Sequence, residues 1–134
     1  MSQQLKIMIA DDMQMMRRLL KSALVKAGFQ DITEAMNGEE LLQKLEETPF
    51  DIIICDWDMP RMTGIEALRH IRKSEIHKNI PFIMVTAVAE ANQVKQAIDV
   101  GISDYIIKPI KPEQFVEKVK KILTQLDLPV PASA

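Results

Sequence analysis

The sequence predicts an α/β fold in which helices cover both faces of a parallel sheet of five strands. Five short apolar runs alternate along the chain with five segments of helical periodicity, and this alternation is typical of a sheet built through helical crossovers. Residues 52–54 are β-branched and uncharged, which indicates a strand buried on both faces. Four of the five runs end in a polar group, so polar side chains are expected along one edge of the sheet.

The first strand is expected at residues 5–10, an apolar run that stops at the acidic pair Asp11 and Asp12. Helical periodicity follows over residues 14–27, and Gly28 can end this helix in the left-handed conformation. Three methionines near the start of the helix are interpreted as packing residues and not as metal ligands. The residues expected to pack are Leu19, Leu20, Ala23, Leu24, Ala27, Met13, Met15 and Met16.

A weaker strand signal covers residues 32–35. In the second helix, Asn37 is expected to cap the N-terminus while Glu40, three positions later, reciprocates as in a capping box. The third strand begins at residue 52 and stops abruptly at Asp56. The expected buried residues of the second helix are Leu41, Leu42 and Leu45.

After the third strand the chain reaches Thr63 and Glu66, which have the spacing of a capping box for a third helix. A fourth apolar run covers residues 82–85 and ends at Thr86. Gly101 is expected to close the fourth helix. The expected inward residues of these two helices are Ile65, Leu68, Ile71, Val94, Ala97 and Ile98.

The fifth strand is expected at residues 105–107 and ends at Lys108 and Pro109. Pro112 suits the first turn of a last helix, because proline there loses no intrahelical hydrogen bond. The expected inner face of this helix consists of Phe115, Val119, Ile122, Leu123 and Leu126.

A chain of 134 residues is expected to form one domain, residues 1–128, followed by a short flexible tail at 129–134. The 17 basic and 19 acidic residues leave a net charge of −2, which argues against non-specific binding to nucleic acid or to membranes. The single cysteine, Cys55, lies in an apolar run and is expected to be buried, without a redox role. With neither an apolar signal segment nor a membrane-spanning stretch, the sequence favours a cytoplasmic protein.

The chemistry is expected where the strands end. In the flavodoxin-like strand order 2-1-3-4-5, the first and third strands are neighbours at the switch point of the doubly wound sheet, so Asp11, Asp12 and Asp56 meet there. Thr86 and Lys108 follow on the next strands. We therefore expect three carboxylates, a hydroxyl and an ammonium to share one crevice.

Three crowded carboxylates need a cation, because each pair repels by roughly 1 to 4 kcal/mol at a separation of about 4 Å. Oxygen ligands with open water positions favour Mg²⁺, and Mn²⁺ is an acceptable substitute. The metal and Lys108 can together offset the charge of a phosphoryl group while a carboxylate oxygen of Asp56 attacks phosphorus in line. The residues therefore predict an acyl phosphate on Asp56.

These motifs resemble those of the receiver domains of bacterial two-component response regulators, and among them the stand-alone, CheY-like members. The resemblance covers nearly all of residues 5–126 and is specific because the motifs occur together in the order of that family. The matching motifs are Asp11-Asp12, Met16-Arg17-Arg18, residues 56–60, Thr86-Ala87, Tyr105 and Lys108-Pro109.

The resemblance implies a role for each matching acidic residue. Asp12 would bind Mg²⁺ directly and Asp11 largely through water. Asp56, the phosphoacceptor, and the backbone carbonyl of Asp58 would be further ligands, and Lys108 would pair with the phosphoryl oxygens.

The resemblance also implies a switch. Thr86 would move to hydrogen-bond the phosphoryl group, and Tyr105 would turn inward to fill the space that Thr86 leaves. The peptide bond between Lys108 and Pro109 would be cis. Such a protein catalyses its own phosphorylation and dephosphorylation but acts mainly as a signalling switch, with Trp57 as a reporter beside the site.

The partners implied by the resemblance are a sensor histidine kinase, a phosphatase and a protein target that binds a monomeric regulator in chemotaxis or motility control. The signalling face would comprise the fourth helix, the fifth strand and the last helix. The flagellar switch is one candidate target, although Ala91 and Ile110 differ from the residues expected in a protein that binds it. The residues expected on this face are Ala91, Lys95, Tyr105, Lys111, Lys118 and Lys121.

Two positions on the expected water path depart from the best-known members of the family. Asp58, two residues after the acceptor, is acidic, and Val88, two residues after Thr86, is apolar. Because Val88 cannot orient an attacking water, we expect these two residues to tune dephosphorylation.

Three alternatives remain open from the sequence. The protein could be a phosphate sink or phosphorelay receiver without motor output, or a scaffold that is not phosphorylated. It could also be an aspartate-nucleophile phosphatase, because residues 52–58 match an apolar run followed by Asp-x-Asp. The early position of the acidic pair Asp11 and Asp12, and the lack of room for a cap domain, favour the receiver.

Overall fold

The computed structural model describes residues 5–131, in which strands and helices alternate from the first strand to the last helix. The strands are β1 (Lys6–Ala10), β2 (Asp31–Ala35), β3 (Ile52–Cys55), β4 (Phe82–Thr86) and β5 (Asp104–Ile107). The helices are α1 (Gln14–Lys26), α2 (Gly38–Glu47), α3 (Gly64–Lys73), α4 (Ala91–Val100) and α5 (Pro112–Gln125). None of these described helices is long and apolar enough to cross a membrane.

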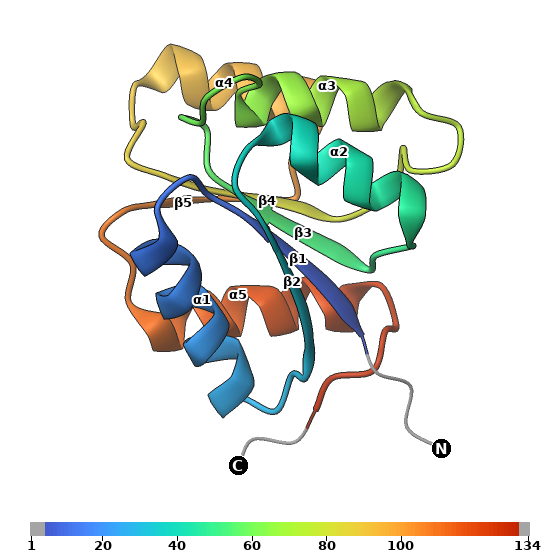
Figure 1. Cartoon of the computed structure of the whole chain (residues 1–134). Helices are drawn as coiled ribbons and strands as arrows, with labels where there is room; N and C mark the ends of the chain where they lie inside the picture. The colour runs from blue at the N-terminus through green and yellow to red at the C-terminus, as the bar shows by residue number, and fades with distance from the viewer. Residues whose placement is uncertain (1–4, 132–134) are drawn as a thin grey trace.

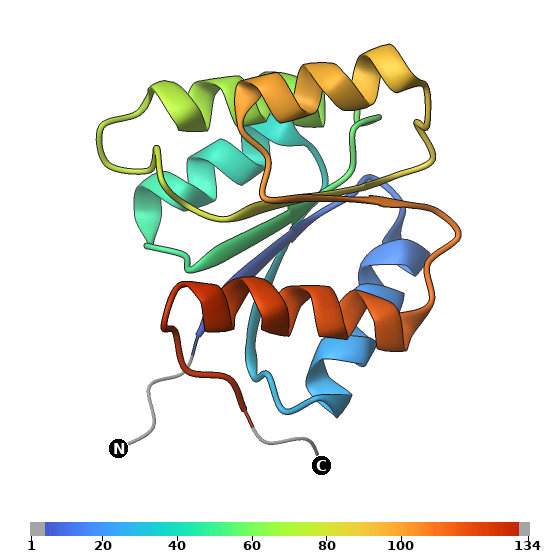
Figure 2. The same ribbon diagram turned by 180° about the vertical axis from the view of Figure 1, so that it is seen from behind.

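The strands form one sheet in the order β2-β1-β3-β4-β5, and every pairing is parallel. Helices α2, α3 and α4 cover one face of the sheet, and α1 and α5 cover the other (Figure 1 and Figure 2). The predicted flavodoxin-like α/β fold and its strand order are therefore confirmed. The Lys108–Pro109 peptide bond is cis, as the resemblance implied.

Two apolar clusters fill the space between the sheet and its helices. Because side chains alternate along a strand, Ile52 and Ile54 of β3 pack in the cluster beneath α1 and α5, whereas Ile53 and Cys55 pack in the cluster beneath α2 and α3. Every residue of β3 is buried, which explains the uncharged run. Burial, with the nearby charges of Asp56 and Asp11, raises the pKa of the Cys55 thiol well above 9.0, in keeping with an unreactive cysteine.

The predicted helix ends are confirmed in most respects. Thr63 and Glu66 form a complete capping box at α3. At α2 the Asn37 side chain accepts the Glu40 N–H at 2.8 Å, as predicted. The Glu40 carboxylate, however, accepts the N–H of Met36 at 3.1 Å, so its reciprocal bond lies one residue upstream of the predicted one. The glycines that follow α1 and α4, Gly28 and Gly101, both have positive φ, of 101° and 114°.

Several apolar side chains that were predicted to pack are exposed. Met15 is 79% exposed and Ile98 is 60% exposed. The reason is that the face of each helix that meets the sheet is narrow. Helix α4 buries only Ala97 completely. In α1, Leu20 faces inward, so the adjacent Leu19 lies on another side of the helix. The other wrong predictions of burial are Met13, which caps α1, Leu19 and Leu126, which caps α5.

The predicted tail lies only partly within the described residues. Val130 packs, half-buried, against the cluster beneath α1 and α5, whereas residues 132–134 lie outside the described part of the chain. The flexibility of residues 129–134 stays a prediction.

Candidate functional site

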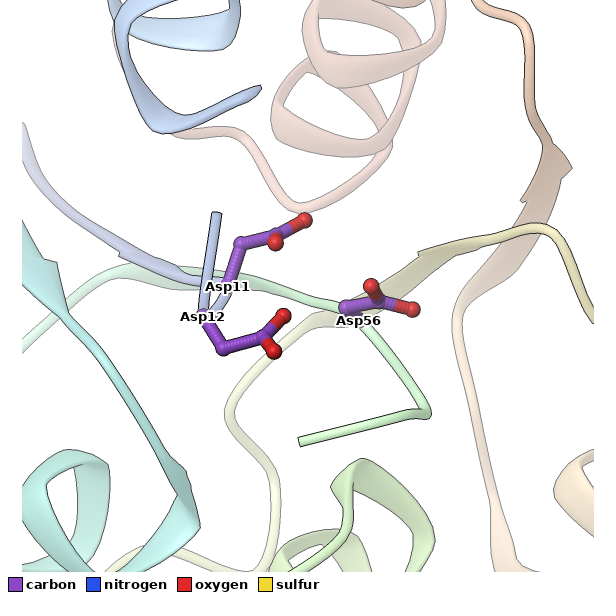
Figure 3. A group of neighbouring side chains, drawn as sticks. All are labelled: Asp11, Asp12 and Asp56. Atoms are coloured by element: carbon purple, nitrogen blue, oxygen red, sulfur yellow. The ribbon is translucent and has the colours of Figure 1, made fainter. Parts of the chain in front are cut away.

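The ends of β1 and β3 bring three carboxylates together. These strands are adjacent, with Ala10 opposite Cys55, and the N–H of Asp56 donates to the Ala10 carbonyl at 2.9 Å. One carboxylate oxygen from each of Asp11, Asp12 and Asp56 lies within 4.8 Å of the others, and the three residues are neighbours at the strand ends (Figure 3). The predicted meeting of these residues at the switch point is confirmed.

Lys108 supplies the positive charge beside two of these carboxylates. Its Nζ donates to Asp56 Oδ2 at 2.9 Å and to Asp11 Oδ2 at 3.0 Å, and its backbone N–H donates to the Thr86 carbonyl at 2.9 Å. Burial alone would lower the pKa of Lys108, but the hydrogen bonds and charges of Asp56 and Asp11 outweigh it and raise the pKa above 10.5. An ammonium ion therefore bridges Asp11 and Asp56.

Asp11 and Asp12 stand in different environments although they are adjacent in the chain. Asp11 is buried, and its Oδ1 accepts the N–H of Met13 at 2.9 Å while its Oδ2 accepts from Lys108. The Asp12 side chain is exposed and has no hydrogen-bond partner among residues 5–131. Asp12 is therefore the carboxylate whose oxygens are most available to bind a cation.

The donor set fits a hard divalent cation. All three groups are carboxylates, and hard cations that keep several water ligands, such as Mg²⁺, are held by one or two carboxylates in an open site. An open pocket is lined by Asp12 of the triad and by Asp58, Met59, Pro60 and Thr63, so the Asp12 carboxylate faces open space. An acidic triad of this kind is typical of the Mg²⁺ site of receiver domains.

Thr86 and Tyr105 are linked through the backbone of Val88. Thr86 is fully buried, and its Oγ1 accepts the N–H of Val88 at 3.2 Å. Tyr105 is half-buried, and its hydroxyl donates to the Val88 carbonyl at 2.6 Å. Burial, with the charges of Asp56 and Asp58, raises the pKa of Tyr105 above 10.0, so the hydroxyl keeps its proton.

The two residues expected to tune dephosphorylation lie in different surroundings. Asp58 is exposed beside the open pocket, and its N–H donates to Asp56 Oδ1 over a long 3.4 Å. The Val88 side chain packs, half-buried, against the cluster beneath α2 and α3.

On the expected signalling face, Lys118 forms an ion pair with Asp104 at 3.4 Å. The other lysines of that set, Lys95, Lys111 and Lys121, are exposed.

One buried residue at this site had no predicted role. Arg17 is 8% exposed, and its guanidinium donates to the Asp11 carbonyl and to the Glu34 carboxylate. The sequence feature that could have indicated this is the position of Arg17, three and seven residues before Leu20 and Leu24, on the buried face of α1. Such a position predicts a partnered charge, because an unpaired one would not be buried.

We expect the metal-free protein to lose stability as the pH rises through the titration of Asp11. Burial is the largest cause that raises the pKa of Asp11 above 3.8. The folded state therefore keeps a proton that the unfolded state has released, and the free energy of unfolding falls with rising pH between the two pKa values. In urea unfolding with EDTA, from about pH 4 to about pH 7, the Asp11→Asn variant should lose less stability than the parent. Identical pH profiles for the parent and Asp11→Asn would contradict the expectation.

The chain is similar to known proteins over most of its length. Residues 7–120 match the family model of the response regulator receiver domain. The chain is 39% identical over 123 residues to the chemotaxis protein CheY of Pseudomonas aeruginosa, covering 92% of this chain and 99% of that protein. It is 38% identical over 126 residues to the chemotaxis protein CheY-3 of Vibrio cholerae, covering 94% of this chain and 97% of that protein.

Solved structures are similar over the same extent. The chemotaxis response regulator CheY4 of Vibrio cholerae superposes with a TM-score of 0.83 at 29% identity, covering 90% of this chain and 100% of that chain. A CheY-like receiver domain protein from Methanospirillum hungatei superposes with a TM-score of 0.86 at 28% identity, covering 93% of this chain and 98% of that one. The similarity therefore includes the strands that carry the acidic triad and Lys108.

Proposed function

Because this chain belongs to the family of response regulator receiver domains, we propose that it accepts a phosphoryl group on Asp56 from a sensor histidine kinase and then acts as a signalling switch. The observation that carries the proposal is the contact of one Asp56 carboxylate oxygen with the Lys108 ammonium, beside Asp11 and Asp12. Residues 1–128 form the single receiver domain in this proposal.

The two oxygens of Asp56 are held differently. Oδ2 accepts from Lys108 at 2.9 Å, whereas Oδ1 accepts only the long 3.4 Å bond from the Asp58 N–H. Oδ1 is therefore the freer oxygen, and we assign it as the nucleophile. Its bond to phosphorus forms as the bond between phosphorus and the histidine nitrogen of the kinase breaks, and the leaving imidazole keeps the electron pair. Asp56 then carries an acyl phosphate.

Charge explains the rest of the site. Asp11, Asp12, Asp56 and the backbone carbonyl of Asp58 would hold Mg²⁺, or Mn²⁺ in its place, and the bound ion supplies neutralisation for the transferring phosphoryl oxygens. Lys108 already touches the acceptor, so its ammonium can follow the negative charge from the carboxylate to the phosphoryl group.

The contacts of Val88 support a route from the site to the signalling face. If the Thr86 hydroxyl turns to a phosphoryl oxygen, the Val88 N–H loses its acceptor, while Tyr105 still holds the Val88 carbonyl. The loop that leads from β4 to α4 and the strand β5 would then respond together, as a shift between two packings.

Relatives named for chemotaxis support a role in chemotaxis or motility control, with a protein target such as the flagellar switch. We place the protein in the cytoplasm, where it would act as a monomer.

Incubation with acetyl phosphate and Mg²⁺, followed by intact-mass measurement, tests the proposal. We expect the protein to gain one phosphoryl group that hydroxylamine removes, and we expect no gain when EDTA is added. Borohydride reduction of the acyl phosphate, followed by peptide mapping, should place the modification at Asp56. Turnover of p-nitrophenyl phosphate without any mass gain would instead support an aspartate-nucleophile phosphatase and overturn the proposal. Absence of both reactions would overturn it in favour of a scaffold.

We expect Val88→Glu to shorten the lifetime of the acyl phosphate, since a carboxylate two residues after Thr86 can accept a hydrogen bond from an attacking water. The affinity for Mg²⁺, followed by Trp57 fluorescence, should change much less. The matched control is Val88→Ile, which keeps the position apolar and should retain the parent lifetime. Equal lifetimes for the parent and Val88→Glu would count against a tuning role for this position.

A further inference from the structure

We propose that Arg17 is a positioning residue for the metal site: it holds the backbone carbonyl of Asp11 and thereby sets the approach of Asp12 to the other two carboxylates. The juxtaposition behind the proposal is a buried guanidinium that donates to the main chain of the acidic pair. The proposal rests on the metal site of the proposed function, and it adds a residue outside the set of cation and phosphoryl contacts.

Arg17 makes two hydrogen bonds from a buried position. Its Nη1 donates to the Asp11 carbonyl oxygen at 2.7 Å, and its Nε donates to Glu34 Oε1 at 3.0 Å. A guanidinium taken out of water has to be paired and hydrogen-bonded, or its burial is strongly unfavourable. The planar fork of arginine suits this double contact, because its two donors point in fixed directions.

The Asp11 carbonyl belongs to the peptide unit that leads into Asp12. A peptide unit is planar, so holding this oxygen also orients the N–H and the Cα of Asp12. The N–H of Asp11 is held separately by the Ala35 carbonyl at 3.1 Å. The Asp12 side chain has no hydrogen-bond partner in the described part of the chain, so its distance to the other carboxylates depends on this backbone.

Glu34 separates the geometric role of Arg17 from a role through charge. Glu34 Oε1 accepts a hydrogen bond from Nε of Arg17, and Glu34 Oε2 lies 3.7 Å from Lys21 Nζ. The charge of Arg17 is thus compensated by Glu34, while the ammonium of Lys108 pairs directly with the carboxylates of the site. Lys108 therefore contributes positive charge to the site, whereas Arg17 fixes the position of the backbone between Asp11 and Asp12.

The test is a titration of the metal-free protein with Mg²⁺, followed by the fluorescence of Trp57, which directly follows Asp56 in the chain. We expect Arg17→Gln to raise the dissociation constant of Mg²⁺ about 10-fold or more, the usual effect of losing a residue that orients a metal ligand. Arg17→Lys should also bind weakly, since it keeps the charge and loses the fork. The matched control is Arg18→Gln, at the exposed neighbouring arginine, which should bind as the parent does.

Urea unfolding of the same variants separates positioning from a structural role. A structural contact alone would lower the unfolding midpoint of Arg17→Gln and leave the dissociation constant of the folded protein unchanged, which would overturn the inference. Recovery of parent affinity in Arg17→Lys would also overturn it, because charge would then be sufficient. If Arg17→Gln does not fold, Arg17→Lys decides, since it keeps the charge that Glu34 compensates and loses the fork that holds the Asp11 carbonyl: a raised dissociation constant supports the inference, and a parent value overturns it. A parent protein that binds no Mg²⁺ would instead overturn the proposed function.

Discussion

We expect the Asp56→Asn variant to take up no phosphoryl group from acetyl phosphate and Mg²⁺ under conditions in which the parent protein takes up one. An amide oxygen is a far weaker nucleophile than a carboxylate oxygen, so the bond to phosphorus does not form. The variant should still fold, because the amide oxygen can accept the hydrogen bond from Lys108, whose ion pair with Asp11 remains. Intact-mass measurement after incubation reads the result directly.

The control for this experiment is Asp58→Asn, which removes an exposed carboxylate two residues further on. In the receiver proposal the backbone carbonyl of Asp58 is the metal ligand and its side chain affects only dephosphorylation, so this variant should still gain one phosphoryl group. In an aspartate-nucleophile phosphatase the second acidic residue of Asp-x-Asp is the general acid, and the same variant would be inactive. A phosphoryl group retained by Asp56→Asn would contradict the assignment of the acceptor.

We expect Gly64→Ala to lower the free energy of unfolding by about 3 kcal/mol, the upper end of the cost of overpacking a well-packed site. A Cβ atom at Gly64 would lie 2.1 Å from the Asp56 carbonyl oxygen and 2.9 Å from the Asp56 carbonyl carbon. These are main-chain atoms that cannot rotate away. Helix propensity favours alanine over glycine, by at most the value of about 1 kcal/mol found in a helix interior, so a net loss can only come from this close approach of α3 to the end of β3.

The same clash should slow phosphoryl uptake, because the displaced atoms belong to the acceptor residue. Thr63→Ala is the matched control: it removes the capping box of α3, at a cost of about 1 kcal/mol, without pushing on Asp56. Urea unfolding and the rate of phosphoryl uptake should therefore separate the two variants, with Thr63→Ala less stable than the parent but equally fast. A Gly64→Ala protein with parent stability and parent uptake would show that α3 can move freely relative to β3.

Most of the fold and the centre of the site followed from the order of residues along the chain. The alternation of apolar runs and helical segments implies a parallel sheet, since parallel strands need crossovers. In such a sheet all strands end at the same edge, so Asp11, Asp12, Asp56 and Lys108 could be placed together although up to 97 positions separate Lys108 from Asp11. Periodicity and strand polarity are local properties, and they place these residues at one edge; that Asp11, Asp12 and Asp56 are neighbours also required the strand order 2-1-3-4-5, which the structure confirms.

The direction in which each helix turns, and the contacts between distant backbones, were decided only by tertiary packing. Ile98 matches the spacing of a buried residue but is exposed, because the narrow face of α4 that meets the sheet is filled by Ala97. Arg17 turns inward to the Asp11 carbonyl, and Gly64 leaves space for the Asp56 carbonyl. These contacts depend on the angle and distance at which helices lie on the sheet, which all the packed side chains determine jointly and which no short stretch of sequence encodes.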